Sequence, residues 1–523
     1  MNITEDNWYQ YKDQIITDIQ ESEFVAVDTE MTGLHYKSRG RFLSQEMVYA
    51  SHRLSTSKFS VTQLGVCPFF LDKKTNTWSC KPYNIYCFPS HSAQDRSILS
   101  FEVGSYAFLS KHNFDFNTWI KKGVHFQSID KWNKKTQSIR EEIRELKEKF
   151  KENIPLKEIA FALNPRRQFI PIERLNEEQK KEFERVNKLV TGWMKITEEK
   201  DLEFTIKDRF LRWFLINHFY RTIPEIYFQN NYIENNTLIK FELRKVTEEE
   251  FKEIQIQSLV TRLEKSKDML GVSELFLNFN KVLVGHNCFL DVFHFISSFI
   301  GPLPKDFSQG KKRILKLFPN IFDTKLITEI TDQSILGKIG KNSTGLGKLF
   351  TDLQDYTSPK ITIAENFTSY LSSDNSHEAG YDAYMTGLIF LKLLQVIKPN
   401  FNFNLKNKLL LKYKNMINLM DCDYKYINLE NEKKLIEDPE DKFHISNIPT
   451  YWRYNNAREE FEIQGIKVRP RFLSKNSILL TISKEKHRKL FIENFIKKKK
   501  NQDVKYIVRY YKAYLQDCID FFN

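Results

Sequence analysis

Two carboxylates two residues apart, Asp28 and Glu30, follow an apolar run in the stretch FVAVDTEMTGL, residues 24–34. The run is rich in β-formers of the kind that lie buried in a sheet, and the spacing puts both acids on one face of an extended segment. Carboxylates crowded at the end of a buried strand repel each other and lose solvation. A cation between them would relieve both costs, so the stretch indicates a metal site. A chance Asp-x-Glu tripeptide is the alternative.

Two further acids lie in comparable surroundings later in the chain. Asp291 stands one turn into an almost entirely apolar helix predicted within residues 281–301, where a lone carboxylate needs a partner. Asp382 lies in the first turns of the buried helix predicted within 376–397, where the helix dipole favours a carboxylate. His377 falls on the loop before that helix, where it can reach solvent and exchange protons. His294 is interpreted as a buried core histidine rather than a ligand.

Four acids and one loop histidine together predict a particular chemistry. Divalent ions held by acidic side chains can bridge a scissile phosphate, lower the pKa of an attacking water and stabilise the leaving oxygen. A histidine that titrates near neutrality can take the proton of that water. The set is therefore typical of metal-dependent phosphodiester hydrolysis.

Composition places these residues in a basic, globular chain. The 523 residues carry a formal charge of +13 and a pI near 9.1, which favours a polyanionic partner, nucleic acid before a membrane surface. The six cysteines have no CxxC pairing, which fits reduced intracellular thiols and argues against a zinc module. The polar N-terminal segment is not typical of a signal peptide, and no apolar run approaches the length of a membrane span. We expect a nuclear or cytoplasmic protein.

The elements that must position the site residues follow from periodicity and turn chemistry. Residues 4–22 predict a helix capped by Thr4, and strands predicted at 61–71 and 83–89 suggest an antiparallel ribbon on one side of a sheet. Asn287 is the candidate cap of the helix that carries Asp291. IFDTKLI, residues 321–327, is predicted as another strand edge, where Lys325 could reach a phosphate.

A change of character from about residue 136 marks an insertion. Residues 139–153 form a charged helical pattern, and a compact unit is predicted from about 165 to 250 with helices at 176–198 and 206–220 and a strand at 238–246. Its second helix mixes arginines with aromatics, which suits either single-stranded nucleic acid or an ordinary aromatic core. Residues 442–483 suggest a β-α-β unit, followed by a basic tail at 497–500.

The order of the motifs resembles the DEDD exonuclease superfamily with a histidine base, and within it the poly(A)-specific ribonuclease deadenylases. The resemblance rests on these stretches, in order along the chain: DTE, HNFDFN, LVGHNCFLDVFHF, LFPNIFDTKLIT, HEAGYDAYMTG and MINLMDCDYKYINLE. It implies an α/β fold with a ribonuclease-H-like mixed-sheet nuclease domain in two pieces, residues 1–138 and 251–430. It also implies an inserted small α+β domain that binds single-stranded nucleic acid, residues 165–250, and a C-terminal RNA-recognition-motif (RRM)-like α+β domain, residues 440–523.

The resemblance also implies function. Asp28, Glu30, Asp291 and Asp382 would be the metal ligands for two Mg²⁺ ions, and His377 the general base. The implied activity is 3′-to-5′ exoribonuclease shortening of poly(A) tails with release of 5′-AMP, in a homodimer that acts on single-stranded RNA 3′ ends and not at membranes. Alternatives are a 3′-end trimmer of small non-coding RNAs and a catalytically inactive RNA-binding scaffold.

Contacts to the RNA are expected from Met31, Phe114, Phe116 and Lys325, with core packing as the alternative for the two phenylalanines and a surface ion pair as the alternative for Lys325. The chain departs from the family at three places. Met31 stands where the family usually has an aromatic residue, the family's arginine-to-histidine spacing is not kept around Arg212 and His218, and Phe472 replaces a cap-stacking tryptophan.

Overall fold

The computed structural model describes residues 1–37, 43–90, 98–151, 170–196, 198–223, 225–233, 238–372, 377–430, 441–462, 465–500 and 505–522. The chain divides into two compact units, of which one joins Met1–Lys131 to Met269–Asn523 and the other is Trp132–Asp268. The predicted insertion at 165–250 falls inside the second unit, and its residues 165–169 lie outside the described part. Among the described residues, no helix combines the length and apolar character needed to cross a bilayer.

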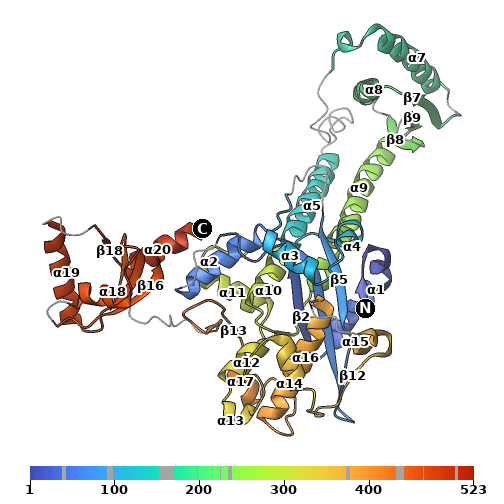
Figure 1. The fold of residues 1–523 in the computed structure, drawn as a ribbon. Helices are drawn as coiled ribbons and strands as arrows, with labels where there is room; N and C mark the ends of the chain where they lie inside the picture. Colours follow the sequence, from blue (N-terminus) through green and yellow to red (C-terminus); the bar gives the residue numbers. More distant parts are fainter. Residues whose placement is uncertain are drawn as a thin grey trace. The chain divides into compact units, whose positions relative to one another are not determined.

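The first unit is built on a mixed sheet with the strand that carries Asp28 and Glu30 near its middle (Figure 1). Its main path runs in the order β1 (Asn2–Ile3), β5 (Tyr83–Pro89), β3 (Val61–Asp72), β2 (Phe24–Met31), β10 (Val282–Gly285), β11 (Ile321–Asp323), β13 (Met416–Asn418) and β14 (Tyr426–Asn428). Off this path, β4 (Thr77–Cys80) pairs with β3 and with β12 (Ile361–Ile363), and β6 (Val124–Phe126) pairs with β5. Strand β2 is antiparallel to β3 and parallel to β10. The predicted mixed sheet and its antiparallel ribbon are confirmed.

Helices cover both faces of this sheet. They are α1 (Glu5–Glu21), α2 (Gln45–Thr56), α3 (Val103–Lys111), α4 (Phe116–Lys122), α10 (Phe289–Phe295), α11 (Phe307–Leu317), α12 (Thr324–Ile330), α13 (Gln333–Leu336), α14 (Leu346–Asp352), α15 (Ser369–Ser372), α16 (Ala379–Ile397) and α17 (Lys408–Tyr413). Helix α1 begins directly after Thr4, as predicted. Strand β2 alternates between the two cores, because Phe24 and Ala26 pack in the cluster that contains α16, while Val25 and Val27 pack in the cluster that contains α1, α2 and α10.

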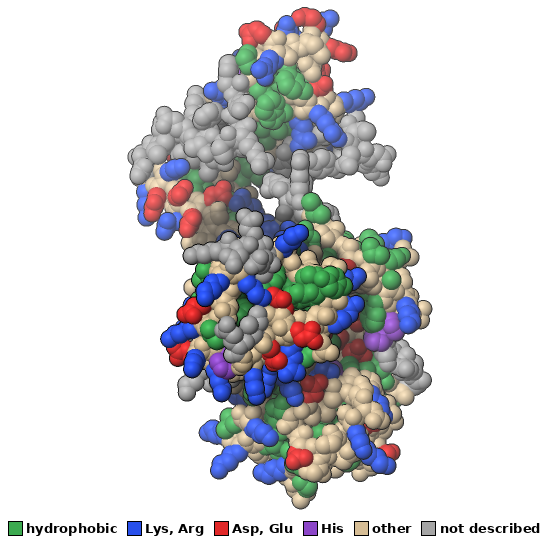
Figure 2. Space-filling model, turned by 60° about the vertical axis from the view of Figure 1, so that its left-hand side comes forward, with side chains coloured by type: hydrophobic (Ala, Val, Ile, Leu, Met, Phe, Trp, Pro, Cys, Tyr) green, Lys and Arg blue, Asp and Glu red, His purple; other side chains and the backbone are tan. Residues whose placement is uncertain are grey.

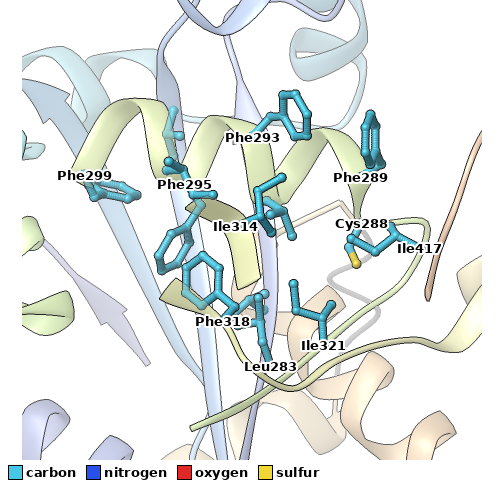
Figure 3. Packing of buried hydrophobic residues seen from close by; sticks show 14 of the residues in the cluster. Leu283, Cys288, Phe289, Phe293, Phe295, Phe299, Ile314, Phe318, Ile321 and Ile417 are labelled. Carbon is cyan, nitrogen blue, oxygen red and sulfur yellow. The ribbon is translucent and has the colours of Figure 1, made fainter. Parts of the chain in front are cut away.

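Aromatic packing fixes α10 against the sheet. Figure 3 shows the side chains of Phe289, Phe293, Phe295 and Phe299 along α10 and the π-helical turn Ile296–Ile300 that continues it, in the same buried cluster as Leu283 of β10. The ring centroids of Phe295 and Phe299 lie 5.6 Å apart at an angle of 83°. His294 is completely buried in this layer, as predicted for a core residue. This packing places the first turn of α10, which carries Asp291, at the end of β10.

The second unit has its own core. It contains most of α5 (Ile129–Lys151), then α7 (Glu177–Met194), β7 (Asp201–Ile206), α8 (Arg209–Thr222), β8 (Ile226–Ile233), β9 (Leu238–Lys245) and α9 (Glu248–Lys265). Its three strands form an antiparallel sheet in the order β7-β9-β8. The two predicted helices and the predicted strand are present, whereas β7 and β8 were not predicted.

A second small antiparallel sheet lies near the C-terminus. The chain order there is β15 (Lys442–Ser446), α18 (Tyr454–Phe461), β16 (Arg469–Ser474), β17 (Ser477–Thr481), α19 (Glu485–Lys500), β18 (Ile507–Tyr510) and α20 (Tyr511–Phe522), with strand order β16-β17-β15-β18. Helices α18 and α19 share a core with Phe443 and Ile445 on one face of the sheet. On the other face, the ring of Tyr514 from α20 stacks on His444, with centroids 3.6 Å apart. Helix α20 therefore covers the face that α18 and α19 leave open.

Candidate active site

Strand β2 presents its two acids to the α16 side of the sheet. Asp28 and Glu30 have the same parity as Phe24 and Ala26, which pack in the core beneath α16. In the neighbouring strand β3, Gly65 pairs with Asp28 and Gln63 pairs with Glu30. Both carboxylates therefore face the helix that carries Asp382.

Side chains from the sheet hold the start of α16 in place. The side-chain oxygen of Gln63 accepts a hydrogen bond from the backbone N–H of Ala379 at 3.4 Å, and that of Asn84 on β5 accepts one from Gly380 at 3.2 Å. A Cβ on Gly65 would overlap the backbone carbonyl of Ala379, so only glycine permits this approach. These contacts satisfy first-turn N–H groups of α16, which have no partner within the helix.

Gly65→Ala is expected to lower kcat by on the order of 10²-fold, because the added methyl group would push the start of α16 away from β2 and misplace the reacting groups by about 1 Å. The measurement is the turnover rate on an oligo(A) RNA, normalised to the folded fraction from a thermal melt. Gly347→Ala in α14 is the matched control, since a Cβ there would meet nothing within 4 Å. A folded Gly65→Ala protein with the original kcat would show that the close approach is dispensable.

The structure brings His377 together with two of the acids. One potential ligand atom each of Glu30, His377 and Asp382 lie within 4.8 Å of one another. The backbone N–H of His377 donates to Oδ1 of Asp382 at 3.3 Å, and His377 has the left-handed backbone value φ 70°. Non-glycine residues in this region are uncommon and cluster at functional sites. The group can hold a cation or pair a histidine base with carboxylates.

Asp291 reaches the same strand from the opposite face of the sheet. Its Oδ1 accepts hydrogen bonds from the backbone N–H of Thr29 at 3.2 Å and from the Thr29 hydroxyl at 2.6 Å. Thr29 lies between Asp28 and Glu30 in the strand, so α10 is tied directly to the acidic segment. The four predicted acids thus converge on β2 from three elements, β2 itself, α10 and α16.

Burial and mutual repulsion weaken the acidity of this set. Loss of solvation, and then the charges of Asp291 and Asp382, raise the pKa of both Asp28 and Glu30 well above its usual range. Burial likewise raises the pKa of Asp291 to about 6, against the hydrogen bonds from Thr29. Crowded carboxylate oxygens that resist ionisation for lack of positive charge are a donor set that fits hard divalent cations. The residues therefore fit the metal that the family resemblance implies.

Asp323, which is almost completely buried, organises the turn before α10. Its carboxylate accepts five backbone hydrogen bonds at 2.9 to 3.2 Å. The donors are the N–H groups of Asn287, Cys288, Lys325, Leu326 and Asn418. Two predictions are corrected here. Asn287 does not cap α10, because it adopts φ 55° and its N–H donates to Asp323, and the cap position falls on Cys288. The predicted strand edge 321–327 ends at Asp323, because the Asp323 carboxylate caps α12 from Thr324 onward.

The four candidate RNA contacts fall in different surroundings. Met31 is only 7% exposed at the end of β2. Phe114 packs against Tyr86 with ring centroids 5.9 Å apart, and Tyr86 pairs with Gln63, which in turn pairs with Glu30. The ring centroid of Phe116 lies 4.8 Å from that of Phe114. Lys325, on α12, donates to the Thr344 hydroxyl at 2.9 Å and lies 3.5 Å from Glu329. The roles of these residues in RNA binding stay predictions.

Sequence reasoning missed two residues that contact the histidine. The ring centroid of His112 lies 3.9 Å from that of His377, and the ring centroid of Phe108 lies 5.0 Å away. His112 opens the motif HNFDFN, but its position in the motif gave no sign that it would meet a loop 265 residues later. The sequence likewise did not point to Gln63, Gly65 and Asn84, because the sequence of a strand does not indicate which helix will pack on it.

Comparisons with known proteins find one family profile, several relatives and several solved structures that are similar to this chain. The profile of the CAF1 family ribonucleases matches residues 3–390. Poly(A)-specific ribonuclease PARN of Homo sapiens is 27% identical over 491 residues, which cover 89% of this chain and 73% of that protein. Pre-piRNA 3′-exonuclease trimmer of Bombyx mori is 25% identical over 402 residues, which cover 75% of this chain and 71% of that protein. The solved structure of S. pombe Pop2p in its Mg²⁺ and Mn²⁺ bound form matches with a TM-score of 0.35 and 14% identity, covering 75% of this chain and 91% of that chain.

Proposed function

Because the chain belongs to the CAF1 family of ribonucleases, we propose that it is a metal-dependent 3′-to-5′ exoribonuclease that shortens poly(A) tails and releases 5′-AMP. The resemblance to poly(A)-specific ribonucleases predicted from the motifs is confirmed, and the enzyme class with it. The observation that carries the finer proposal is the convergence of Asp28, Glu30, Asp291 and Asp382 with His377 around one strand.

The four carboxylates and His377 divide the chemistry between them. Asp28, Glu30, Asp291 and Asp382 would hold two Mg²⁺ ions, whose charge would stabilise the scissile phosphate and lower the pKa of an attacking water. His377 accepts the proton of that water as its oxygen bonds to phosphorus. The P–O3′ bond then breaks, the 3′ oxygen of the shortened RNA takes up a proton, and the 5′-monophosphate leaves. The hydrogen bond from the His377 backbone N–H to the Asp382 carboxylate holds the candidate base next to this carboxylate.

Substrate choice is proposed to come from the site and not from overall charge. The net charge of +13 attracts any RNA with an affinity that falls steeply with salt. Figure 2 shows basic side chains spread over the visible face with acidic ones between them, which is consistent with such sequence-independent attraction. The half-buried rings of Phe114 and Phe116 are the candidate stacking surface for the last bases, and adenine stacks well.

The two small sheets are proposed to assist RNA binding. The β-α-β-β-α-β order of the C-terminal sheet supports its assignment as an RRM-like domain, although α20 covers the face that would stack bases. Phe472, which stands where the family has a cap-stacking tryptophan, is half-buried against the core of this domain. In the second unit, Phe210 and Trp213 are exposed on α8 with Arg209, whereas His218 packs between Phe183 and Phe214. A homodimer and a nuclear or cytoplasmic location stay predictions.

Initial rates on tailed RNAs test the proposal. We expect an A-tailed RNA to be degraded faster than U- or C-tailed RNA at fixed salt, because a purine run stacks better on aromatic rings such as those of Phe114 and Phe116. A duplex 3′ end should be a poor substrate, and A-tailed DNA should be cut more slowly because it lacks the 2′-hydroxyl.

Two controls frame this comparison. Chelation of divalent metal should stop all reactions, and the products should be 5′-monophosphates. Equal rates on A, U and C tails would contradict a poly(A)-selective pocket and favour a 3′-end trimmer, the activity named for the Bombyx mori relative. No turnover on any tail would leave the RNA-binding scaffold.

A further inference from the structure

Three aromatic rings meet at the candidate base. The rings of His112 and His377 lie 3.9 Å apart at 54°, those of Phe108 and His377 lie 5.0 Å apart at 83°, and those of Phe108 and His112 lie 4.6 Å apart. Phe108 lies in the last turn of α3 and His112 caps its C-terminal end, with its backbone N–H donating to the carbonyls of Phe108 and Leu109. The two rings of α3 therefore form one surface against the imidazole of His377.

Helix α3 is itself anchored to the segment that follows the acidic strand. The backbone N–H of Glu102, which precedes α3, donates to the carbonyl of Thr32 at 2.8 Å. The Glu102 carboxylate accepts hydrogen bonds from the backbone N–H groups of Leu34 at 2.7 Å and His35 at 3.4 Å. Leu109, in the last turn of α3, is 1% exposed. A rigid path thus runs from β2 through Glu102 and α3 to the ring of His377.

We propose that Phe108 and His112 are positioning residues that hold the imidazole of His377 in register with Glu30 and Asp382, an inference that rests on the proposed nuclease function. His377 needs such support, because its left-handed backbone and half-exposed side chain leave the ring direction weakly determined by its own residue. Packing against two aromatic planes orients the His377 ring through shape. The ring shape of His112 is what matters, and its nitrogen atoms are not required.

Variants of residue 112 separate positioning from other roles. His112→Ala should lower kcat on oligo(A) RNA by about 10- to 100-fold with little change in KM, because a base misplaced by about 1 Å acts slowly on a substrate that still binds. His112→Phe should recover most of the rate, since it restores a planar ring. Ser110→Ala, on the exposed surface of the same helix, is the matched control and should keep the original rate. Equal losses in His112→Ala and His112→Phe would overturn the proposal.

A double-mutant cycle removes the remaining ambiguity between positioning and folding. In a protein that already lacks the imidazole of His377, His112→Ala should cause no further loss of rate, because there is no ring left to position. A loss of the same size in both backgrounds would identify a general structural role and contradict the proposal.

A spectroscopic readout keeps this test apart from the test of function. In full-length protein with ¹³C-labelled histidine rings, 11 residues give signals, and the His377 signal is assigned from a His377 variant. We expect this signal to shift and broaden in His112→Ala and to return in His112→Phe. An unchanged His377 signal in His112→Ala would refute the packing, whether or not the wild-type protein degrades RNA. A wild-type protein without turnover but with the expected ring signals would refute only the proposed nuclease function.

Discussion

Replacing Asp28, Glu30, Asp291 or Asp382 with its amide, one at a time, is expected to reduce turnover by on the order of 10³-fold or more, since metal-ion charge stabilisation is worth several kcal/mol. The amide keeps the volume of the side chain and removes the charge that holds the cation. Each variant should still fold, because the four acids meet at the end of a strand whose core neighbours are untouched. The measurement is the initial rate on oligo(A) RNA across a Mg²⁺ titration. A variant with a near-normal rate would remove that residue from the ligand set.

For the same variants we also predict a change in stability, and its direction follows from the raised pKa values. Burial raises the pKa of Asp28, Glu30 and Asp291 in the folded protein. The folded state therefore binds more protons than the unfolded state above about pH 4, and the stability of the metal-free protein falls as the pH rises toward the raised folded values. Asp28→Asn should accordingly raise the Tm of metal-free protein at pH 8, where the wild-type protein must hold crowded negative charges.

Added Mg²⁺ should reverse this order. The wild-type Tm should rise with Mg²⁺ because the ion binds only the folded site, whereas Asp28→Asn should lose most of that rise. Asp72→Asn is the control on the neighbouring strand β3: hydrogen bonds from Thr75 and Lys74 lower the pKa of Asp72, so its amide should not raise the Tm. A metal-free Asp28→Asn protein that is less stable than the wild-type protein at pH 8 would show that Asp28 has a structural partner other than a cation.

The candidate site residues could be singled out from the sequence because their signals are local. Asp28 and Glu30 are marked by two-residue spacing after an apolar run, and the face they share was fixed by strand alternation before any partner was known. Asp382 and Asp291 were marked by carboxylates in otherwise apolar helices, which need a partner. Convergence of all four on β2 is what the fold added.

The supporting residues could not be predicted because their roles depend on pairing across the chain. Gly65 matters only because β3 aligns it with Asp28 and α16 lies on top of it, some 300 residues later in the sequence. Asp323 was placed in a strand that continues to residue 327, since IFDTKLI is apolar enough for either structure. Two of the five backbone donors that its carboxylate gathers, Lys325 and Leu326, lie in the first turn of α12 and mark a helix start there. The pattern of apolar and polar residues around Asp323 does not indicate which distant backbone N–H groups its carboxylate will bind.

Removal of the His377 imidazole should lower kcat by about 10²- to 10⁴-fold, the range for loss of a general base. The choice of variant matters, because His377 has φ 70°. Histidine and asparagine are both enriched in the left-handed region, so His377→Asn removes the imidazole with little change in backbone preference, and glycine adopts this backbone freely. His377→Asn and His377→Gly are therefore the informative variants.

Metal dependence then decides between two roles that the geometry allows. A potential ligand atom of His377 lies within 4.8 Å of those of Glu30 and Asp382, so the imidazole could act as a base or bind the ion itself. If His377 acts as a base, removing its imidazole should leave two Mg²⁺ concentrations unchanged. These are the concentration that gives the half-maximal rate and the one that gives half of the Tm rise. As a ligand, its loss would shift both concentrations upward together. His125→Asn, on β6 of the same sheet, controls for the loss of a histidine elsewhere. A rate that falls only in proportion to the folded fraction would reduce His377 to a structural residue at the start of α16.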